Sequence, residues 1–266
     1  MIRINSKSDP SDQVIVIDIG NTTVGVGTWQ AGNLLAPLSV SIEDQKAFEE
    51  AWAGHASACP RGRPAATVIA SVVPNTLQRI RSFVTEAVAR QALVVGESIP
   101  LPMDLAVDAK GVGVDRVCTA AVVYDRLKTA CTVVTFGTAV TVDLVDDEGT
   151  FQGGAILPGL RMQLQALHHY TAALPEVEPG LPPAPYGRNT VEAIQAGVCR
   201  GIAGAVRALV ESYATSLNRW PQVVATGGDA EFLAPQCDFV DTLVSHLTLR
   251  GVGFAYTKHM TAKGAW

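Results

Sequence analysis

Two stretches of this sequence share one pattern, in which an apolar strand leads through a turn of glycine and threonine into a second strand. The first is VIVIDIGNTTVGVG at Val14–Gly27, and the second is VVTFGTAVTVD at Val133–Asp143, nearly half of the 266 residues further on. One such stretch would predict no more than a β-hairpin. Two of them, one in each half, predict a duplicated fold, and 266 residues are a natural length for two compact lobes.

The turn of the first stretch has residues that suit a polyphosphate. Gly20 lets backbone N–H groups approach an anion, and Asn21, Thr22 and Thr23 supply short hydrogen-bond donors. Asp18, at the end of the strand, fits beside phosphate only if a Mg²⁺ ion or its waters lie between the two negative groups. The alternative is an ordinary hairpin in which Asp18 caps the turn.

Two later turns extend the hypothesis that the chain binds a nucleotide. Gly137 and Thr138 form the turn of the second stretch, so each half would have one phosphate-binding loop, with the nucleotide in the cleft between the halves. Gly227 and Gly228 follow the strand expected at Val223–Ala225 and could lie against the adenosine part. A plain turn explains this glycine pair equally well.

A candidate general base lies in the stretch GVGVDRVCTAAVVYD, at Gly111–Asp125. Its glycines predict a turn that runs into a helix, with Asp115 and Arg116 in the first helical turn. A carboxylate in a cleft can accept the proton of a hydroxyl that attacks a γ-phosphate, and Arg116 could hold a substrate carboxylate. Alternatively, Asp115 caps the helix and Arg116 forms a surface salt bridge.

Composition and charge exclude several classes of protein. Charged residues are 17% and apolar residues 48%, so we expect a filled core and not a disordered chain. A net charge of −5 without a long Lys/Arg run argues against a nucleic-acid partner. Five scattered cysteines without a CxxC motif favour buried free thiols in a reducing cytosol over a zinc site. No segment is expected to be long and apolar enough to span a bilayer, which predicts a soluble cytoplasmic protein.

The order of the expected elements predicts an α/β fold, with a mixed sheet flanked by helices in each lobe. Residues 1–13 are expected to form a flexible leader, residues 14–130 the first lobe and residues 131–266 the second. A long helix is expected to begin at Val191. Three of its glycines predict close packing against a neighbour, namely Gly197, Gly201 and Gly204.

Seven motifs, in this order along the chain, resemble those of the type III pantothenate kinases. They are DIGNT at Asp18–Thr22, SVVPN at Ser71–Asn75, GVGVDR at Gly111–Arg116, FGTAVTVD at Phe136–Asp143, GGAILPGL at Gly153–Leu160, YGRNTVEAIQAGV at Tyr186–Val198 and TGGDA at Thr226–Ala230. The resemblance implies the acetate kinase/sugar kinase/actin-like superfamily, with two duplicated ribonuclease-H-like lobes in a homodimer. It also implies ATP-dependent phosphorylation of pantothenate to 4′-phosphopantothenate, the first step of coenzyme A biosynthesis.

The resemblance also implies roles for individual residues. Asp18–Gly25 would form the first phosphate loop, with Asp18 serving Mg²⁺-ATP, and Thr138 would contact phosphate from the second loop. Asp115 would be the base that deprotonates the hydroxyl of pantothenate. The residues that would line the pantothenate site are Gly113, Val114 and Arg116, with Thr190 reaching it at the dimer interface.

The chain departs from the pattern of that family at two positions. Thr135 stands where the family usually has an Asp that binds the activating monovalent cation, and a neutral hydroxyl holds K⁺ or NH₄⁺ poorly because it contributes no charge. Ala106 stands nine residues before Asp115, where the family usually has a Tyr against pantothenate. Three hypotheses follow: a pantothenate kinase, a catalytically impaired or regulatory homologue, and a kinase for another small hydroxylated substrate. Asp115, together with Asp18, favours an active kinase.

Overall fold

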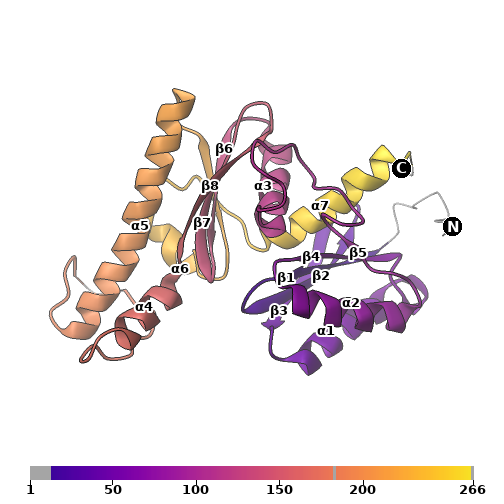
Figure 1. Ribbon diagram of the computed structural model, residues 1–266, viewed down its shortest axis with the longest axis horizontal. Helices are drawn as coiled ribbons and strands as arrows, with labels where there is room; N and C mark the ends of the chain where they lie inside the picture. The colour runs from indigo at the N-terminus through magenta and orange to yellow at the C-terminus, as the bar shows by residue number, and fades with distance from the viewer. Residues whose placement is uncertain (1–12, 182–183, 265–266) are drawn as a thin grey trace. The chain divides into compact units, whose positions relative to one another are not determined.

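The computed structural model describes residues 13–181 and 184–264, which form two compact units (Figure 1). Unit 1 contains the chain up to Asp104, then Asp108–Val122 and the C-terminal part from His246. Unit 2 contains Leu105–Val107 and Val123–Ser245. The C-terminal residues therefore lie in unit 1, whereas the sequence analysis assigned them to the second lobe. The predicted leader, apart from Gln13, lies outside the described residues.

The sheet of unit 1 has five strands in the order β3-β2-β1-β4-β5. Strand β1 is antiparallel to β2 and parallel to β4, so the sheet is mixed, as predicted. The strands are β1 (Val14–Ile19), β2 (Thr23–Gln30), β3 (Asn33–Ser41), β4 (Ala66–Ser71) and β5 (Leu93–Val94).

Helices cover both faces of this sheet, because the side chains of β1 alternate between two cores. Ile15, Ile17 and Ile19 pack with α1 (Gln45–Ala58) and α2 (Pro74–Val88). Val14 and Val16 pack instead with α7 (Leu247–Ala262) and with Cys118 of α3 (Val114–Leu127). Figure 1 shows α1 and α2 on one side of the sheet and α7 on the other. A short 3₁₀ helix, η1, spans Pro60–Gly62.

The sheet of unit 2 repeats the same topology. Its order is β10-β9-β6-β7-β8, and β6 is antiparallel to β7 and parallel to β9, as β1 is to β2 and β4. The prediction of a duplicated fold is therefore confirmed by strand order and direction. The strands are β6 (Cys131–Phe136), β7 (Ala139–Val145), β8 (Phe151–Pro158), β9 (Gln222–Thr226) and β10 (Thr242–Leu243).

The helices of unit 2 include one long helix, α5 (Thr190–Leu217), which Asn189 caps by accepting a hydrogen bond from the Glu192 backbone N–H at 2.9 Å. Its length and composition would allow it to cross a bilayer, so the expectation that no segment is long and apolar enough was wrong. One face of α5 packs in the core of unit 2. The other helices are α4 (Leu160–His169), α6 (Ala230–Leu233) and the 3₁₀ helix η2 (Ala234–Gln236).

The expectation that the glycines of α5 mark close packing was also wrong. A Cβ atom added at Gly197, Gly201 or Gly204 would meet no described atom within 4 Å. Helical spacing places these glycines together on the surface of α5 and away from the core face that contains Ile202 and Val206. The prediction for the cysteines is confirmed, since all five are buried free thiols.

Candidate functional site

The first predicted phosphate turn is present in unit 1 and is open to solvent. Ile19 of β1 pairs with Val24 of β2, and the backbone N–H of Gly20 donates to the carbonyl oxygen of Thr23 at 3.0 Å. The side chains of Asn21, Thr22 and Thr23 are exposed. The turn therefore presents short polar side chains to solvent, and phosphate binding by them stays a prediction.

Asp18 lies beside this turn, and one oxygen of its carboxylate, the buried Oδ1 atom, has no hydrogen-bond partner among the described residues. Burial, together with the negative charge of Asp115, raises the pKa of Asp18 to about 7. An unpaired carboxylate in a buried position costs free energy unless it binds a proton or a cation. The site therefore fits a bound cation on chemical grounds.

Asp115 lies in the first turn of α3, where the sequence placed a candidate base. Its Oδ1 atom accepts a hydrogen bond from the Arg116 backbone N–H at 2.9 Å. Burial raises the pKa of Asp115, while this hydrogen bond and the Arg116 charge oppose the shift. A carboxylate whose pKa is raised toward neutrality is a better general base at physiological pH.

Gly113 leaves room for the carboxylate of Asp115. A Cβ atom at this position would lie 2.6 Å from Asp115 Oδ1, closer than non-bonded atoms can approach. The side chain of Val114 packs against the core of unit 1, so its role in any binding site would be to hold the turn in place. A side chain at position 113 would therefore displace the carboxylate from this position.

Unit 1 brings Asp18 and Asp115 together, although they are far apart in the sequence. The charge of each reaches the thiol of Cys118, one helical turn after Asp115, and burial with these two charges raises the pKa of that thiol. Cys118 is fully buried and stays protonated at neutral pH. The site thus contains two carboxylates of elevated pKa, which is typical of a catalytic centre.

The second predicted phosphate turn lies in unit 2, in contact with the glycine pair that follows β9. The Gly137 N–H donates to the Ala139 carbonyl oxygen at 3.1 Å, and the Asp229 N–H donates to the Phe136 carbonyl oxygen at 3.0 Å. Gly227 has a φ of +110°, and a Cβ there would lie 2.1 Å from the Phe136 oxygen. Only glycine fits at this contact. Gly228 faces open space among the described atoms.

A third glycine at this turn was not predicted as a site residue. The Gly159 N–H donates to the Thr138 carbonyl oxygen at 3.0 Å, and a Cβ at Gly159 would lie 2.3 Å from the backbone oxygens of Gly137 and Thr138. The signal was available in the dipeptide Pro158-Gly159 before α4, which predicts a turn but not what the turn touches. In unit 2, two further glycine turns thus lie against the turn of Gly137.

Thr135 and Asp18 occupy equivalent positions in the two units. Asp18 is the penultimate residue of β1 and pairs with Gly25 and Ala70. Thr135 is the penultimate residue of β6 and pairs with Thr141 and Thr226. Unit 2 therefore has a neutral hydroxyl where unit 1 has a carboxylate.

Ala106 is held by its backbone, since its N–H donates to the Phe151 carbonyl oxygen of β8 at 2.9 Å. Its side chain is exposed.

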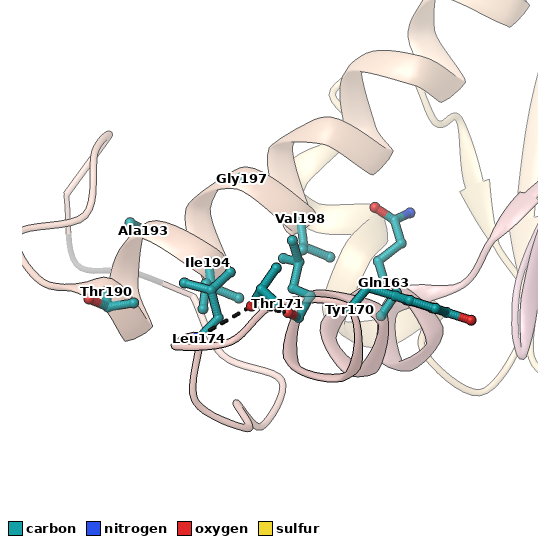
Figure 2. A pocket seen from close by; sticks show the side chains of 11 residues that line it. Gln163, Tyr170, Thr171, Leu174, Thr190, Ala193, Ile194, Gly197 and Val198 are labelled. Carbon is teal, nitrogen blue, oxygen red and sulfur yellow. Dashed lines mark hydrogen bonds between the residues drawn. The ribbon is translucent and has the colours of Figure 1, made fainter.

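Thr190 lies in a groove of unit 2 with a volume of about 660 Å³, between α4 and α5 (Figure 2). The side chain of Tyr170 at the end of α4 is 83% exposed beside it. The groove is mainly apolar, with Leu167, Leu174, Ile194 and Val198 among its lining residues. The described residues that line this groove include none of the glycine turns, and Thr190 lies on a surface with exposed apolar groups.

Comparison with known proteins identifies a family. The profile of the family described as Type III pantothenate kinase matches residues 14–212. The Type III pantothenate kinase of Syntrophotalea carbinolica is 34% identical over 252 residues, covering 92% of this chain and 99% of that protein. The corresponding protein of Moorella thermoacetica is 31% identical over 252 residues with the same coverage.

The structural comparison agrees at the level of the fold. A solved structure from Campylobacter jejuni, described as a conserved putative Baf family transcriptional activator, has a TM-score of 0.62 and 19% identity. The match covers 95% of this chain and all of that one. At this identity the likeness supports the fold alone.

Proposed function

The chain belongs to the type III pantothenate kinase family, and we propose that it transfers the γ-phosphate of ATP to the hydroxyl of pantothenate in coenzyme A biosynthesis. The observation that carries the proposal is the pair of half-buried carboxylates of raised pKa, Asp18 and Asp115, beside an open polar turn in unit 1. A protein that only bound nucleotide would have no use for a base of raised pKa.

In the proposed reaction, Asp115 accepts the proton of the attacking hydroxyl as the new phosphate ester bond forms and ADP leaves. The backbone N–H groups and hydroxyls of the two turns, around Gly20 and around Gly137, bind phosphate oxygens. Arg116 holds the carboxylate of pantothenate and so orients the acceptor. Gly227 and Gly228 lie against the adenosine part of the nucleotide.

Mg²⁺ is proposed as the divalent cofactor, with Asp18 as the protein group that would hold it, directly or through water. The unsatisfied Oδ1 atom of Asp18 supports this assignment, because oxygen ligands with negative charge suit Mg²⁺. When bound, the ion would neutralise charge that develops on the phosphates.

The neutral side chain of Thr135 leads us to propose weak dependence on a monovalent cation. We would measure ADP release with Mg-ATP and pantothenate, with and without K⁺ or NH₄⁺. Turnover that requires pantothenate and is the same with and without the cation would agree with an uncharged Thr135 in place of the family's Asp. Turnover that still requires the cation would mean that another group supplies the charge. No turnover from folded protein in either salt would favour a catalytically impaired homologue instead.

The role of Asp115 is tested by Asp115→Asn, which keeps the shape of the side chain and removes the base. We expect turnover to fall at least about 100-fold, as for loss of a general base, while the Kd for Mg-ATP stays within about twofold. Asp125→Asn is the matched control, because Asp125 is an exposed carboxylate on the same helix that pairs with Lys128. Normal turnover of Asp115→Asn would exclude Asp115 as the base.

We also propose that the protein is a cytoplasmic homodimer in which Thr190 contributes to the pantothenate site of the partner. Large exposed apolar side chains lie on β8, on and just after α4, and just before and at the start of α5, and a monomer would leave them in water. They are Ile156, Met162, Tyr170, Tyr186 and Val191.

A further inference from the structure

The first turn of α3, which contains Asp115, is tied to the first turn of α7 by two hydroxyl groups. Thr119 is buried, and its hydroxyl donates to the carbonyl oxygen of Asp115 at 2.7 Å. The hydroxyl oxygens of Thr119 and Thr248 are 3.1 Å apart. A hydroxyl has one proton to donate, so Thr248 donates to Thr119 and Thr119 donates to Asp115.

The backbones of α3 and α7 touch at the same level. A Cβ atom at Gly251 would lie 2.2 Å from the carbonyl oxygen of Cys118, so only a glycine allows this approach. Since Cys118 and Thr119 follow Asp115 within about one turn of helix, α7 contacts α3 at two points next to the base. This contact lies wholly within unit 1.

The same helix also reaches the strand beside Asp18. Gly25 is the cross-strand neighbour of Asp18 on β2, and a Cβ atom at Gly25 would lie 3.3 Å from the side chain of Leu249. Leu249 follows Thr248 directly in α7 and is buried. Helix α7 is therefore in contact with the residues next to both carboxylates.

From these contacts we infer that Thr248 is a positioning residue for catalysis, whose hydroxyl acts through Thr119 to hold the Asp115 carboxylate at its working distance from Asp18. The inference rests on the proposed role of Asp115 as the base. A displacement of about 1 Å in a reacting group can lower a rate by as much as 100-fold, so a single hydroxyl in this chain of contacts affects turnover.

The test replaces Thr248 by a residue of the same shape without a hydroxyl. For Thr248→Val we expect kcat to fall roughly tenfold while the KM for ATP stays within about twofold, because the nucleotide contacts are unchanged. Thr248→Ser keeps the hydroxyl and should restore kcat to within about twofold of the wild type.

The matched control is Thr257→Val on the same helix. Thr257 accepts a hydrogen bond from the Trp29 indole N–H at 2.9 Å, so its loss removes a comparable contact of α7 without touching α3. Thr257→Val should lower Tm about as much as Thr248→Val and leave kcat unchanged. Equal loss of kcat in the two valine variants, unchanged kcat in Thr248→Val, or failure of Thr248→Ser to restore it would each overturn the inference.

Asp115→Asn, measured in parallel, separates this inference from the proposed function. If Asp115→Asn is inactive and Thr248→Val is normal, only the positioning role fails. If Asp115→Asn keeps its turnover, the proposed base fails. Amide hydrogen exchange tests the contact without any activity: residues 115–119 should exchange roughly tenfold faster in Thr248→Val and not in Thr257→Val. Unchanged exchange would exclude the hydroxyl link as a restraint on α3.

Discussion

Asp18 is a residue that the fold does not satisfy by itself, since its buried Oδ1 atom has no hydrogen-bond partner among the described residues. Five of the six residues of β1 are fully buried, so the strand carries this carboxylate into an apolar setting. A protein keeps such a group where function needs it, because burial without a partner lowers stability. The stability of the free protein should therefore depend on the charge of Asp18.

We predict that Asp18→Asn changes how stability depends on pH. The raised pKa of about 7 means that the folded state binds a proton where the unfolded chain has released it. The contribution of Asp18 to stability is therefore most favourable below about pH 4, and up to roughly 4 kcal/mol of it is lost as pH rises to about 8. Asp18→Asn removes this loss, so it should be more stable than the wild type at pH 8 and should bind Mg-ATP less tightly.

Urea unfolding at pH 5 and pH 8 measures the first effect, and calorimetric titration with Mg-ATP measures the second. Asp125→Asn serves as the control, because this exposed carboxylate already has Lys128 as a partner. If the free energy of unfolding of Asp18→Asn depends on pH as that of the wild type does, ionisation of Asp18 costs the folded protein little free energy.

Gly113→Ala should reduce catalysis with little effect on folding. The new Cβ would lie 2.6 Å from Asp115 Oδ1, so the carboxylate must rotate away. Since the backbone at Gly113 is not in the left-handed region, we expect Tm to change little and kcat to fall roughly tenfold to 100-fold. Gly111→Ala is the control in the same turn, because a Cβ there meets no described atom within 4 Å. Equal kcat for the two variants would contradict the steric argument.

At the scale of elements, the same strand–turn–strand serves different purposes in the two units. In unit 1 the turn after β1 lies beside a carboxylate, and in unit 2 the turn after β6 lies beside a hydroxyl and two further glycine turns. A Cβ atom at Gly20 or Gly137 would make only ordinary contacts, whereas the backbone contacts of Gly159 and Gly227 in unit 2 leave no space for a side chain. Substitutions at these glycines should therefore act through the position of the whole turn.

The glycine pair after β9 provides a matched test of this view. Gly227→Ala combines a positive φ with a Cβ only 2.1 Å from the Phe136 oxygen. We expect a loss of about 2–3 kcal/mol in the free energy of unfolding, together with weaker ATP binding as the second turn shifts. Gly228→Ala meets open space and should keep wild-type stability. Urea unfolding measures the stability of both variants, and titration with ATP measures their binding. Equal stability of the two variants would contradict the steric role of Gly227.

At the scale of the whole molecule, the two units share one sheet topology, and each is built from segments that are not contiguous in the sequence. The chain enters unit 2 at Leu105–Val107, returns to unit 1 and leaves it again within α3. It comes back at His246, whose φ of 55° turns the backbone into α7. Helix α7 is thus the last element of the chain and yet part of the site in unit 1.

The proposed dimer is tested by mixing two inactive proteins, Asp115→Asn and Thr190→Val. If Thr190 serves the partner's site, each mixed dimer has one complete site. Random mixing in equal amounts should then restore about one quarter of wild-type activity, since half of the dimers are mixed and one of their two sites is intact. If the dimers exchange subunits and the mixture still has no activity, Thr190 does not contribute to the partner's site. A monomer by light scattering would exclude the dimer itself.

The sequence by itself determined the local elements and the residues most suited to chemistry. Alternating apolar residues and glycine turns predicted both hairpins, because strand periodicity and turn propensity act between neighbours in the chain. The mixed sheet of each half followed from the order of these elements. Asp18 and Asp115 stood out because each is a carboxylate next to a glycine turn.

Only the tertiary structure decided which of these residues meet. Three contacts join segments that are far apart in the chain. They are the approach of Asp18 to Asp115, the contact of Gly159 with the second turn, and the hydrogen bond between Thr248 and Thr119. It also showed that the glycines of α5 face open space, and that the last helix belongs to the first unit. Local pattern does not contain this information, because long-range packing depends on which surfaces exclude water together.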